Sequence, residues 1–185
     1  MSSNPNGAWT FGWEGTLNGS LTLYNTIRES WQWYDKDHHS GDYTPTVWQN
    51  HGPPTNGVPT GSLSLHPGWD GSFAVARWTS PVSATVTVTG AFDAGDWGAM
   101  SYYISGNGVT LYSWPSDANT EAFSFKRTVV AGDTLDFIVG VNVGGGYWYG
   151  NTPVSVTIAV PEPESYALML AGLGVLGAVA RRRKA

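Results

Sequence analysis

The sequence contains no cysteine, which excludes a disulfide framework, a thiol nucleophile and any metal site with cysteine ligands. Charged side chains are also scarce, at 12% of the 185 residues against an ordinary share of about 25%. This scarcity excludes a coiled coil, which needs charged helix formers. The net charge of −5 argues against a general nucleic-acid binder, because such proteins present a basic face.

Basic residues are nearly absent from most of the chain. Up to Glu164 there are five bases against all 14 acids, a net charge of −9. The last 21 residues carry four bases and no acid. The chain therefore divides into chemically different segments, and we predict a folded body at 1–160, a linker at 161–164 and a hydrophobic tail at 165–185.

The tail begins with an uncharged run over residues 165–180, and a basic cluster follows it: Arg181, Arg182, Arg183 and Lys184. Such a run forms a helix of about 24 Å, which snorkelling bases and local thinning can fit to a ~30 Å hydrocarbon core. We predict a transmembrane helix with its basic end in the cytoplasm. An amphipathic or buried core helix is the alternative, which the lack of a polar stripe disfavours. The prolines of 161–164 predict a stiff, extended linker.

The order of these elements resembles the PEP-CTERM sorting signal: Pro161, Glu162 and Pro163, then the short apolar helix to Ala180, then the basic cluster. The resemblance implies an exported protein of a Gram-negative, polysaccharide-producing bacterium. It implies processing by an exosortase near the Pro-Glu-Pro motif, with a transient inner-membrane-anchored intermediate. The final location would be the cell surface or the extracellular space.

The first residues do not match the signal peptide that such proteins usually carry. Met1 to Gly7 contain neither a basic region nor an apolar region. We expect that the start has been trimmed or misassigned, and the alternative is export by another route.

The body is dominated by alternation of apolar and polar residues, the period of half-buried strands. The alternation is clearest over 82–92, 135–143 and 154–160, and weaker over 21–27, 73–75 and 123–125. Asn-Gly pairs at 6–7, 18–19, 56–57 and 107–108 favour tight hairpins. The pattern predicts an all-β fold of roughly eight to ten strands, an antiparallel β-sandwich or jelly roll. Residues 50–61 are predicted to be a loop.

Leu65 to Gly68 with Ser72 to Pro81 resembles a stretch common in secreted bacterial β-sandwiches of the PEP-CTERM class. Ala131 to Phe137 resembles a strand entry seen in many carbohydrate-binding-like jelly rolls. The resemblance implies the fold more than an activity, and no binding residue is transferred from it.

Tryptophan is the most informative residue type, with ten in the chain. Flat aromatic rings stack on the C–H face of sugars and bring a large contact area with few rotatable bonds. We predict a carbohydrate-binding loop at Tyr147, Trp148 and Tyr149, which glycines flank. A second predicted cluster is Trp31, Trp33 and Tyr34, with Trp31 and Trp33 on one face if they share a strand. Packing in the core is the alternative for each indole.

Metal binding has weak support. Residues 35–42 hold carboxylates and imidazoles, but their spacing fits neither an EF-hand nor a zincin helix, so we predict a solvated loop without metal. A structural Ca²⁺ is possible at the pairs Asp93 with Asp96 and Asp133 with Asp136. The alternative is that these aspartates form turns.

No catalytic motif is present: neither Gly-x-Ser-x-Gly, nor His-Glu-x-x-His, nor a phosphate-binding glycine-rich loop with lysine. Arg77 lies in a strand pattern, where we expect an outward salt bridge. The sequence therefore predicts a non-catalytic surface or matrix protein that binds exopolysaccharide. The alternatives are a structural biofilm or sheath protein that self-associates through its edge strands, and a small polysaccharide-active enzyme.

Overall fold

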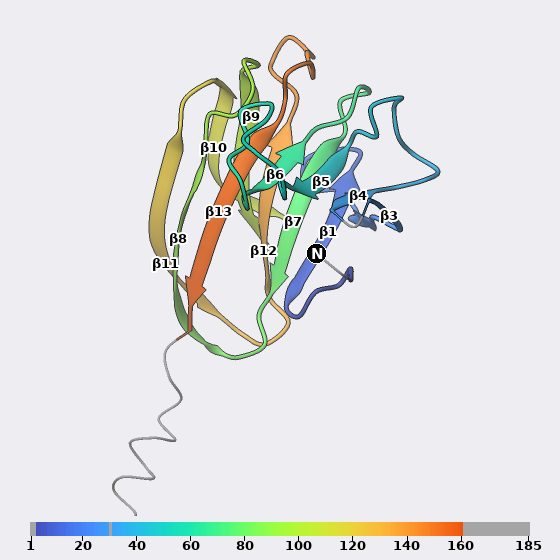
Figure 1. Ribbon diagram of the computed structural model, residues 1–185. Helices are drawn as coiled ribbons and strands as arrows, with labels where there is room; N and C mark the ends of the chain where they lie inside the picture. The colour runs from blue at the N-terminus through green and yellow to red at the C-terminus, as the bar shows by residue number, and fades with distance from the viewer. Residues whose placement is uncertain (1–2, 30, 161–185) are drawn as a thin grey trace, which may run out of the picture.

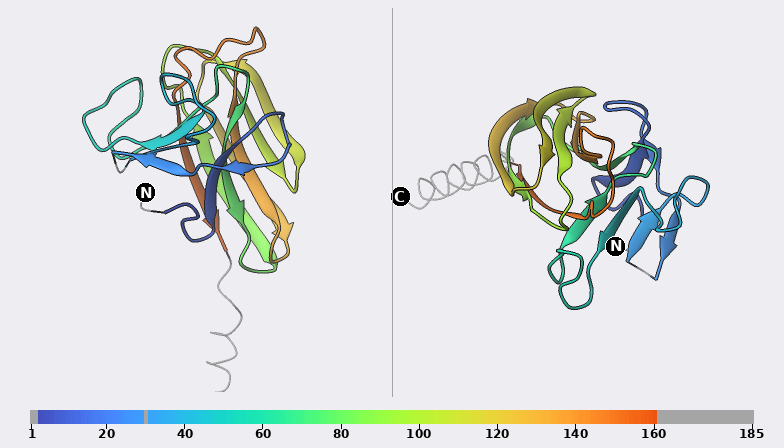
Figure 2. Two further views of the ribbon diagram at one scale, coloured as in Figure 1. Left: turned by 90° about the vertical axis from the view of Figure 1, so that its right-hand side faces the viewer. Right: turned by 90° about the horizontal axis from the view of Figure 1, so that it is seen from above.

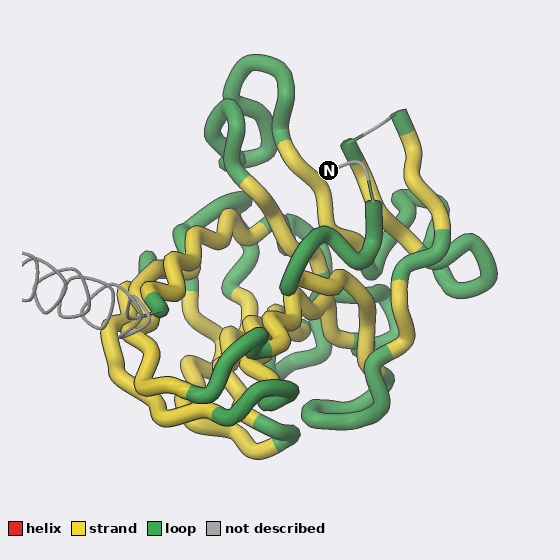
Figure 3. Tube along the Cα trace, turned by 90° about the horizontal axis from the view of Figure 1, so that it is seen from below, coloured by secondary structure: helices red, strands yellow, loops and turns green. Residues whose placement is uncertain are grey.

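The computed structural model describes residues 3–29 and 31–160. Within these residues the regular structure is entirely β-strand, as Figure 3 shows. The thirteen strands are β1 (Trp9–Glu14), β2 (Thr22–Leu23), β3 (Thr26–Arg28), β4 (Gln32–Tyr34), β5 (Thr46–Gln49), β6 (Leu63–His66), β7 (Phe73–Thr79), β8 (Ala84–Phe92), β9 (Met100–Gly106), β10 (Val109–Asp117), β11 (Glu121–Val129), β12 (Thr134–Gly140) and β13 (Thr152–Ala159).

The strands form two sheets that pack face to face, which confirms the predicted antiparallel β-sandwich (Figures 1 and 2). The six-stranded sheet has the order β10-β9-β12-β7-β1-β2. The seven-stranded sheet has the order β11-β8-β13-β6-β5-β4-β3. The turn between β10 and β11 joins the two sheets at one edge, and the chain between β2 and β3 joins them at the other.

The core lies between the sheets and follows the alternation in the sequence. Val86 and Val88 of β8 and Leu135 and Phe137 of β12 are fully buried. Across the interior, Phe137 packs on Phe123 with ring centroids 5.7 Å apart. Burial of these side chains is the main stabilising contribution, at roughly 25 cal/mol per Å² of apolar surface.

The Asn-Gly pair at 107–108 also forms a turn, as the sequence predicted. Asn107 and Gly108 have φ angles of 50° and 73° and join β9 to β10 with Gly106 opposite Val109, which confirms the predicted hairpin. The strand count was too low, because β2 to β5 are only two to four residues long and show little alternation. Conversely, β12 ends at Gly140 rather than 143, since residues 141–151 form a loop.

The segment from β3 to residue 61 is irregular and projects beside the long strands (Figure 2). Its order comes from polar side chains. Buried Asp35 accepts hydrogen bonds from Trp13 Nε1 at 3.0 Å, Asn25 Nδ2 at 2.8 Å and the Asp37 N–H at 3.0 Å. Burial raises the pKa of Asp35, but these hydrogen bonds outweigh it and lower the pKa below its usual value.

Arg77 forms the expected salt bridge, but not with exposed partners. Its Nε lies 2.6 Å from Asp136 Oδ1 and its Nη2 3.3 Å from Glu14 Oε1. Both carboxylates are buried. Arg77 faces away from the core, as expected, because its neighbours Ala76 and Trp78 pack between the sheets, but the burial of its two partners was not foreseen.

The end of β13 at Ala159 lies at the opposite end of the sandwich from loops 93–99 and 141–151 (Figure 1). Three predictions lie outside the described residues: the linker at 161–164, the helix and tail at 165–185, and the sorting-signal residues Pro161, Glu162, Pro163, Arg181, Arg182, Arg183 and Lys184. In the part that is described, no helix is long and apolar enough to cross a membrane.

Candidate functional site

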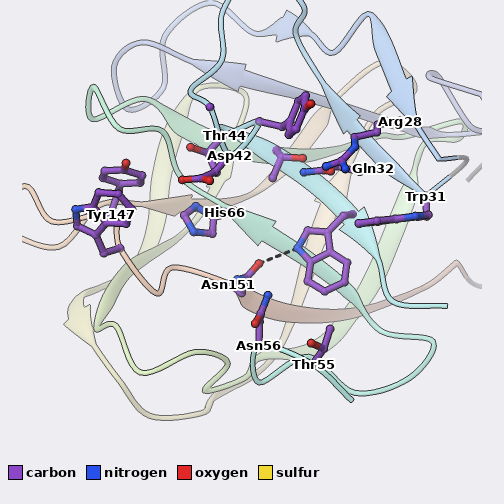
Figure 4. Close-up of a pocket in the computed structure, with 15 residues that line it drawn as sticks. Arg28, Trp31, Gln32, Asp42, Thr44, Thr55, Asn56, His66, Tyr147 and Asn151 are labelled. Atoms are coloured by element: carbon purple, nitrogen blue, oxygen red, sulfur yellow. Dashed lines mark hydrogen bonds between the residues drawn. The ribbon is translucent and has the colours of Figure 1, made fainter. Parts of the chain in front are cut away.

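A cleft of about 450 Å³ opens beside the short strands β4, β5 and β6, in the size range of ligand sites (Figure 4). Its walls come from segments far apart in the chain. The lining residues are Arg28, Trp31, Gln32, Gly41, Asp42, Tyr43, Thr44, Thr46, Trp48, Thr55, Asn56, His66, Tyr147, Trp148 and Asn151.

Five tyrosine and tryptophan rings line the cleft, and four of them form two pairs. Trp48 is nearly buried, and its Nε1 donates a hydrogen bond of 2.8 Å to Asn151 Oδ1. Trp31 meets Trp48 edge to face, with ring centroids 5.5 Å apart. At the other end Tyr147 packs on Trp148 at 4.5 Å, and Trp148 remains 63% exposed. The cleft therefore has aromatic side chains at both ends, and Figure 4 shows Tyr147 at one end and Trp31 at the other.

His66 brings a polar group to the centre of the cleft. Its Nδ1 lies 2.8 Å from the carbonyl oxygen of Pro67, which can only accept, so Nδ1 carries the proton. Burial lowers the pKa of His66, which keeps the ring neutral. The unprotonated Nε2 is therefore a hydrogen-bond acceptor.

Arg28 and Tyr43 close the opposite wall. The Arg28 guanidinium lies 4.5 Å above the Tyr43 ring and pairs with Glu29 at 2.9 Å, so its charge is already partnered. Tyr43 has a φ of 63°, a left-handed conformation that bulky residues seldom adopt. Such backbone strain is concentrated at functional sites.

The predicted aromatic residues fall into three groups. Trp31, Tyr147 and Trp148 line the cleft, although Trp31 precedes β4 and Tyr147 lies in a distant loop. Tyr149 is exposed beside the cleft with a φ of 59° and is not part of its lining. Trp33 was predicted wrongly, because it points into the core between the sheets and is 9% exposed.

Several lining residues were missed by the sequence analysis. Trp48 lies in the short strand β5, and nothing in its sequence neighbourhood separates it from the core indoles. Asn56 occupies the predicted Asn-Gly turn, so its place in a turn was foreseeable but not its place in a cleft. Asp42 is the last residue of the segment 35–42, which was considered only as a metal-binding loop. Asn151 follows the predicted loop directly.

The residues considered for metal binding have other partners. Asp136 is paired with Arg77, Asp133 accepts from Asn107 and the Val130 N–H, and Asp96 accepts from Asn151. Across residues 3–29 and 31–160, no group of three or more histidine, aspartate and glutamate side chains is placed to hold a metal ion. A structural Ca²⁺ stays an untested prediction.

His38 and His39 pack against aromatic rings. His38 stacks on Trp13 at 3.8 Å, and His39 on Tyr43 at 5.4 Å. Their loop is therefore folded onto the body rather than merely solvated.

Solved structures give distant similarities. A family 35 carbohydrate-binding module from an environmental isolate is 11% identical, with 49% of this chain and 67% of that chain covered and a TM-score of 0.32. CBM51 from Clostridium perfringens GH95, in complex with methyl-galactose, is 11% identical, with 63% and 81% covered and a TM-score of 0.33. A β-glucosidase from Kluyveromyces marxianus is 10% identical, with 89% and 18% covered and a TM-score of 0.37. Such TM-scores do not establish a common fold.

No curated protein matches the chain. Residues 159–184, however, match the model of the PEP-CTERM protein-sorting motif, as the order of Pro-Glu-Pro, apolar run and basic cluster led us to expect. The chain therefore carries a PEP-CTERM protein-sorting motif, the signal of an exported protein with a membrane-anchored intermediate.

Proposed function

We propose that this protein is a non-catalytic, exported glycan-binding protein that is processed by an exosortase and binds exopolysaccharide in the cleft between Trp31 and Trp148. The observation that carries the proposal is the composition of the cleft. Aromatic faces at both ends alternate with the hydrogen-bonding groups of Gln32, Asp42 and Asn56. Pyranose rings need this pairing of apolar faces and polar edges.

The charge around the cleft favours an uncharged glycan. Asp42 is exposed at the rim, and Arg28 is already paired with Glu29. The chain up to Glu164 carries a net charge of −9, which repels polyanions at low ionic strength. We therefore expect neutral polysaccharides to bind better than polyuronates.

The position of the cleft suits a protein held by its C-terminal signal. The loops that carry Tyr147 and Trp148 lie at the end of the sandwich opposite Ala159 (Figure 1). An anchored intermediate would thus present the cleft away from its attachment point.

Hydrolysis has little support in the cleft. A typical glycosidase places two carboxylates about 5–10 Å apart around the scissile bond. Among the described residues that line the larger cleft, Asp42 is the carboxylate, and a second one is absent. Binding without catalysis is the function that these side chains support.

The test is titration of the full chain with a panel of neutral and acidic polysaccharides, including the host's own, followed by tryptophan emission. We expect saturable binding of a neutral glycan that falls roughly tenfold or more in Trp31→Ala and in Trp148→Ala. Trp69→Ala is the matched control, because this exposed indole lines neither of the described clefts. A flat response across the panel would refute the proposal.

Self-association is a second candidate function, and one observation favours it. Four exposed apolar side chains gather on loops 93–99 and 141–151, which are hydrogen-bonded to each other through the Gly98 N–H and the Tyr149 carbonyl at 3.1 Å. They are Trp97, Val143, Trp148 and Tyr149. Of the four edge strands, β2 and β3 are very short and β10 has two register shifts, so β11 is the edge left for pairing between molecules. Oligomers in sedimentation velocity that dissociate in Trp97→Ala would support this candidate.

A further inference from the structure

A second cleft of about 250 Å³ adjoins the first. It is lined by Trp31, Trp48, Gln49, Asn50, His51, Gly52 and Thr55. Trp31, Trp48 and Thr55 belong to both linings, so the two clefts meet at the Trp31–Trp48 pair rather than lying on separate faces.

The Trp31–Trp48 pair is fixed in place. The indole of Trp48 is held by Asn151, and the Trp31 carbonyl accepts a 2.9 Å hydrogen bond from the Gln49 N–H. Trp31 Nε1 donates to Glu29 Oε2 at 3.3 Å. The two rings meet at an interplanar angle of 65°, and Trp31 lines both clefts.

The loop that walls the second cleft is also preorganised. Buried Asn50 donates from Nδ2 to the carbonyls of Pro53 at 3.0 Å and Val58 at 2.9 Å, and accepts from the Gly52 N–H at 2.9 Å. This side chain, the backbone hydrogen bonds between Thr55 and Val58 and the burial of Val58 together hold the loop of residues 51–58 closed on itself. A ligand in the second cleft therefore does not have to order the loop, which lowers the cost of binding.

The second cleft contains polar groups suited to the same class of ligand. His51 Nε2 lies 3.2 Å from Gln49 Oε1, and both side chains border the cleft. The apolar surface comes again from Trp31 and Trp48. The chemistry on the two sides of the tryptophan pair is therefore alike.

We propose that the two clefts form one groove that binds the interior of an extended, uncharged polysaccharide chain, with Trp31, supported from behind by the nearly buried Trp48, as the central platform and the 49–52 segment as an outer subsite. The inference rests on the proposed glycan-binding function and adds the form of the ligand: a chain passing through the groove rather than a single sugar or a chain end. Residues 50–61, which the sequence indicated only as a loop, supply the outer wall.

Two glycines offer a matched pair of variants. A Cβ at Gly52 would meet only Asn50 Oδ1 at 3.7 Å, and a Cβ at Gly41 would meet nothing within 4 Å. Gly52→Leu places bulk in the second cleft, and Gly41→Leu places the same bulk in the first. Neither glycine has a positive φ, so we expect both variants to keep the thermal stability of the original protein.

The experiment measures the affinity of the full chain for cello-, manno-, xylo- and isomalto-oligosaccharides from disaccharide to octasaccharide. We expect affinity to rise with length and Gly52→Leu to weaken octasaccharide binding roughly tenfold while leaving the disaccharide unchanged. Gly41→Leu should weaken both lengths alike.

Affinity that is independent of length, or a Gly52→Leu variant that binds the octasaccharide normally, would overturn the extended groove and leave the glycan-binding function standing. Failure of the original protein to bind any oligosaccharide or polysaccharide would overturn both.

Discussion

The long strands β7 to β13 and the segment from Thr22 to Gly61 are built by different means. The long strands run for seven to nine residues and, apart from the largely exposed edge strand β10, each buries apolar side chains in the core between the sheets. The segment has strands of two to four residues and relies on the hydrogen bonds of Asp35 and Asn50. Alternation hides aromatic faces in the core, whereas loops held by polar side chains can leave them open to a ligand. This explains why most of the cleft comes from the irregular segment.

The largest effect should come from the apolar core. Phe137 is fully buried between Trp9 and Phe123, so Phe137→Ala should lower the free energy of unfolding by about 3–5 kcal/mol. Trp97→Ala is the control, because its indole is 92% exposed and should change stability by less than about 0.5 kcal/mol. Urea unfolding measures both. If both variants lost a similar free energy of unfolding, the long strands would not be the main source of stability.

Buried Glu14 of β1 is a polar residue in the regular part of the fold, and it predicts that the stability of the protein depends on pH. Desolvation and the neighbouring Asp136 raise the pKa of Glu14 to about 7, although Arg77 opposes this. The folded state therefore retains a proton that the unfolded chain has lost, and stability should fall as pH rises from about 4.5 through 7. The expected loss is on the order of 2–3 kcal/mol.

Glu14→Gln tests this dependence, because the variant cannot ionise at this position. Its unfolding free energy should vary less between pH 5 and pH 8 than that of the original protein. Identical pH profiles would show that Glu14 is already ionised in the folded state.

The smallest effect should be confined to the irregular segment. Asp35→Ala leaves the Trp13 indole N–H without its acceptor and should cost about 2 kcal/mol. Hydrogen exchange should accelerate over residues 25–49 but not in β8, β12 or β13. Asp37→Ala is the control, since that carboxylate is exposed and pairs with Lys36. Uniform acceleration across both sheets would mean that the two regions unfold as one unit.

The regular part of the fold was predictable because its signal is local. Period-two alternation marks β8, β12 and β13, and Asn107-Gly108 marks a hairpin through its positive φ angles. The weak alternation over 21–27 covers β2 and most of β3 but does not separate them, and β4 and β5 escaped prediction because three or four residues cannot display a period. Strands β9 and β10 were missed since aromatic and polar residues interrupt their pattern.

The candidate site was only partly predictable, for the same reason. An excess of tryptophan indicates a role for some indoles, but it does not say which face solvent. Trp31 and Trp33 are two positions apart, yet one lines the cleft and the other packs in the core, because β4 begins only at Gln32. Trp148 was predicted as exposed because glycines precede and follow its loop, and it is.

The sequence by itself determined the sorting motif at 159–184 and the all-β class of the body, since a linear signal and a hydrophobic period are both properties of consecutive residues. Only the tertiary structure decided the cleft. Trp48 and Asn151 are 103 positions apart and become partners because β5 and the entry to β13 lie at the same end of one sheet. Whether an indole is core or binding surface depends on what the opposite sheet covers, and that is a property of the packed sandwich rather than of any segment of the chain.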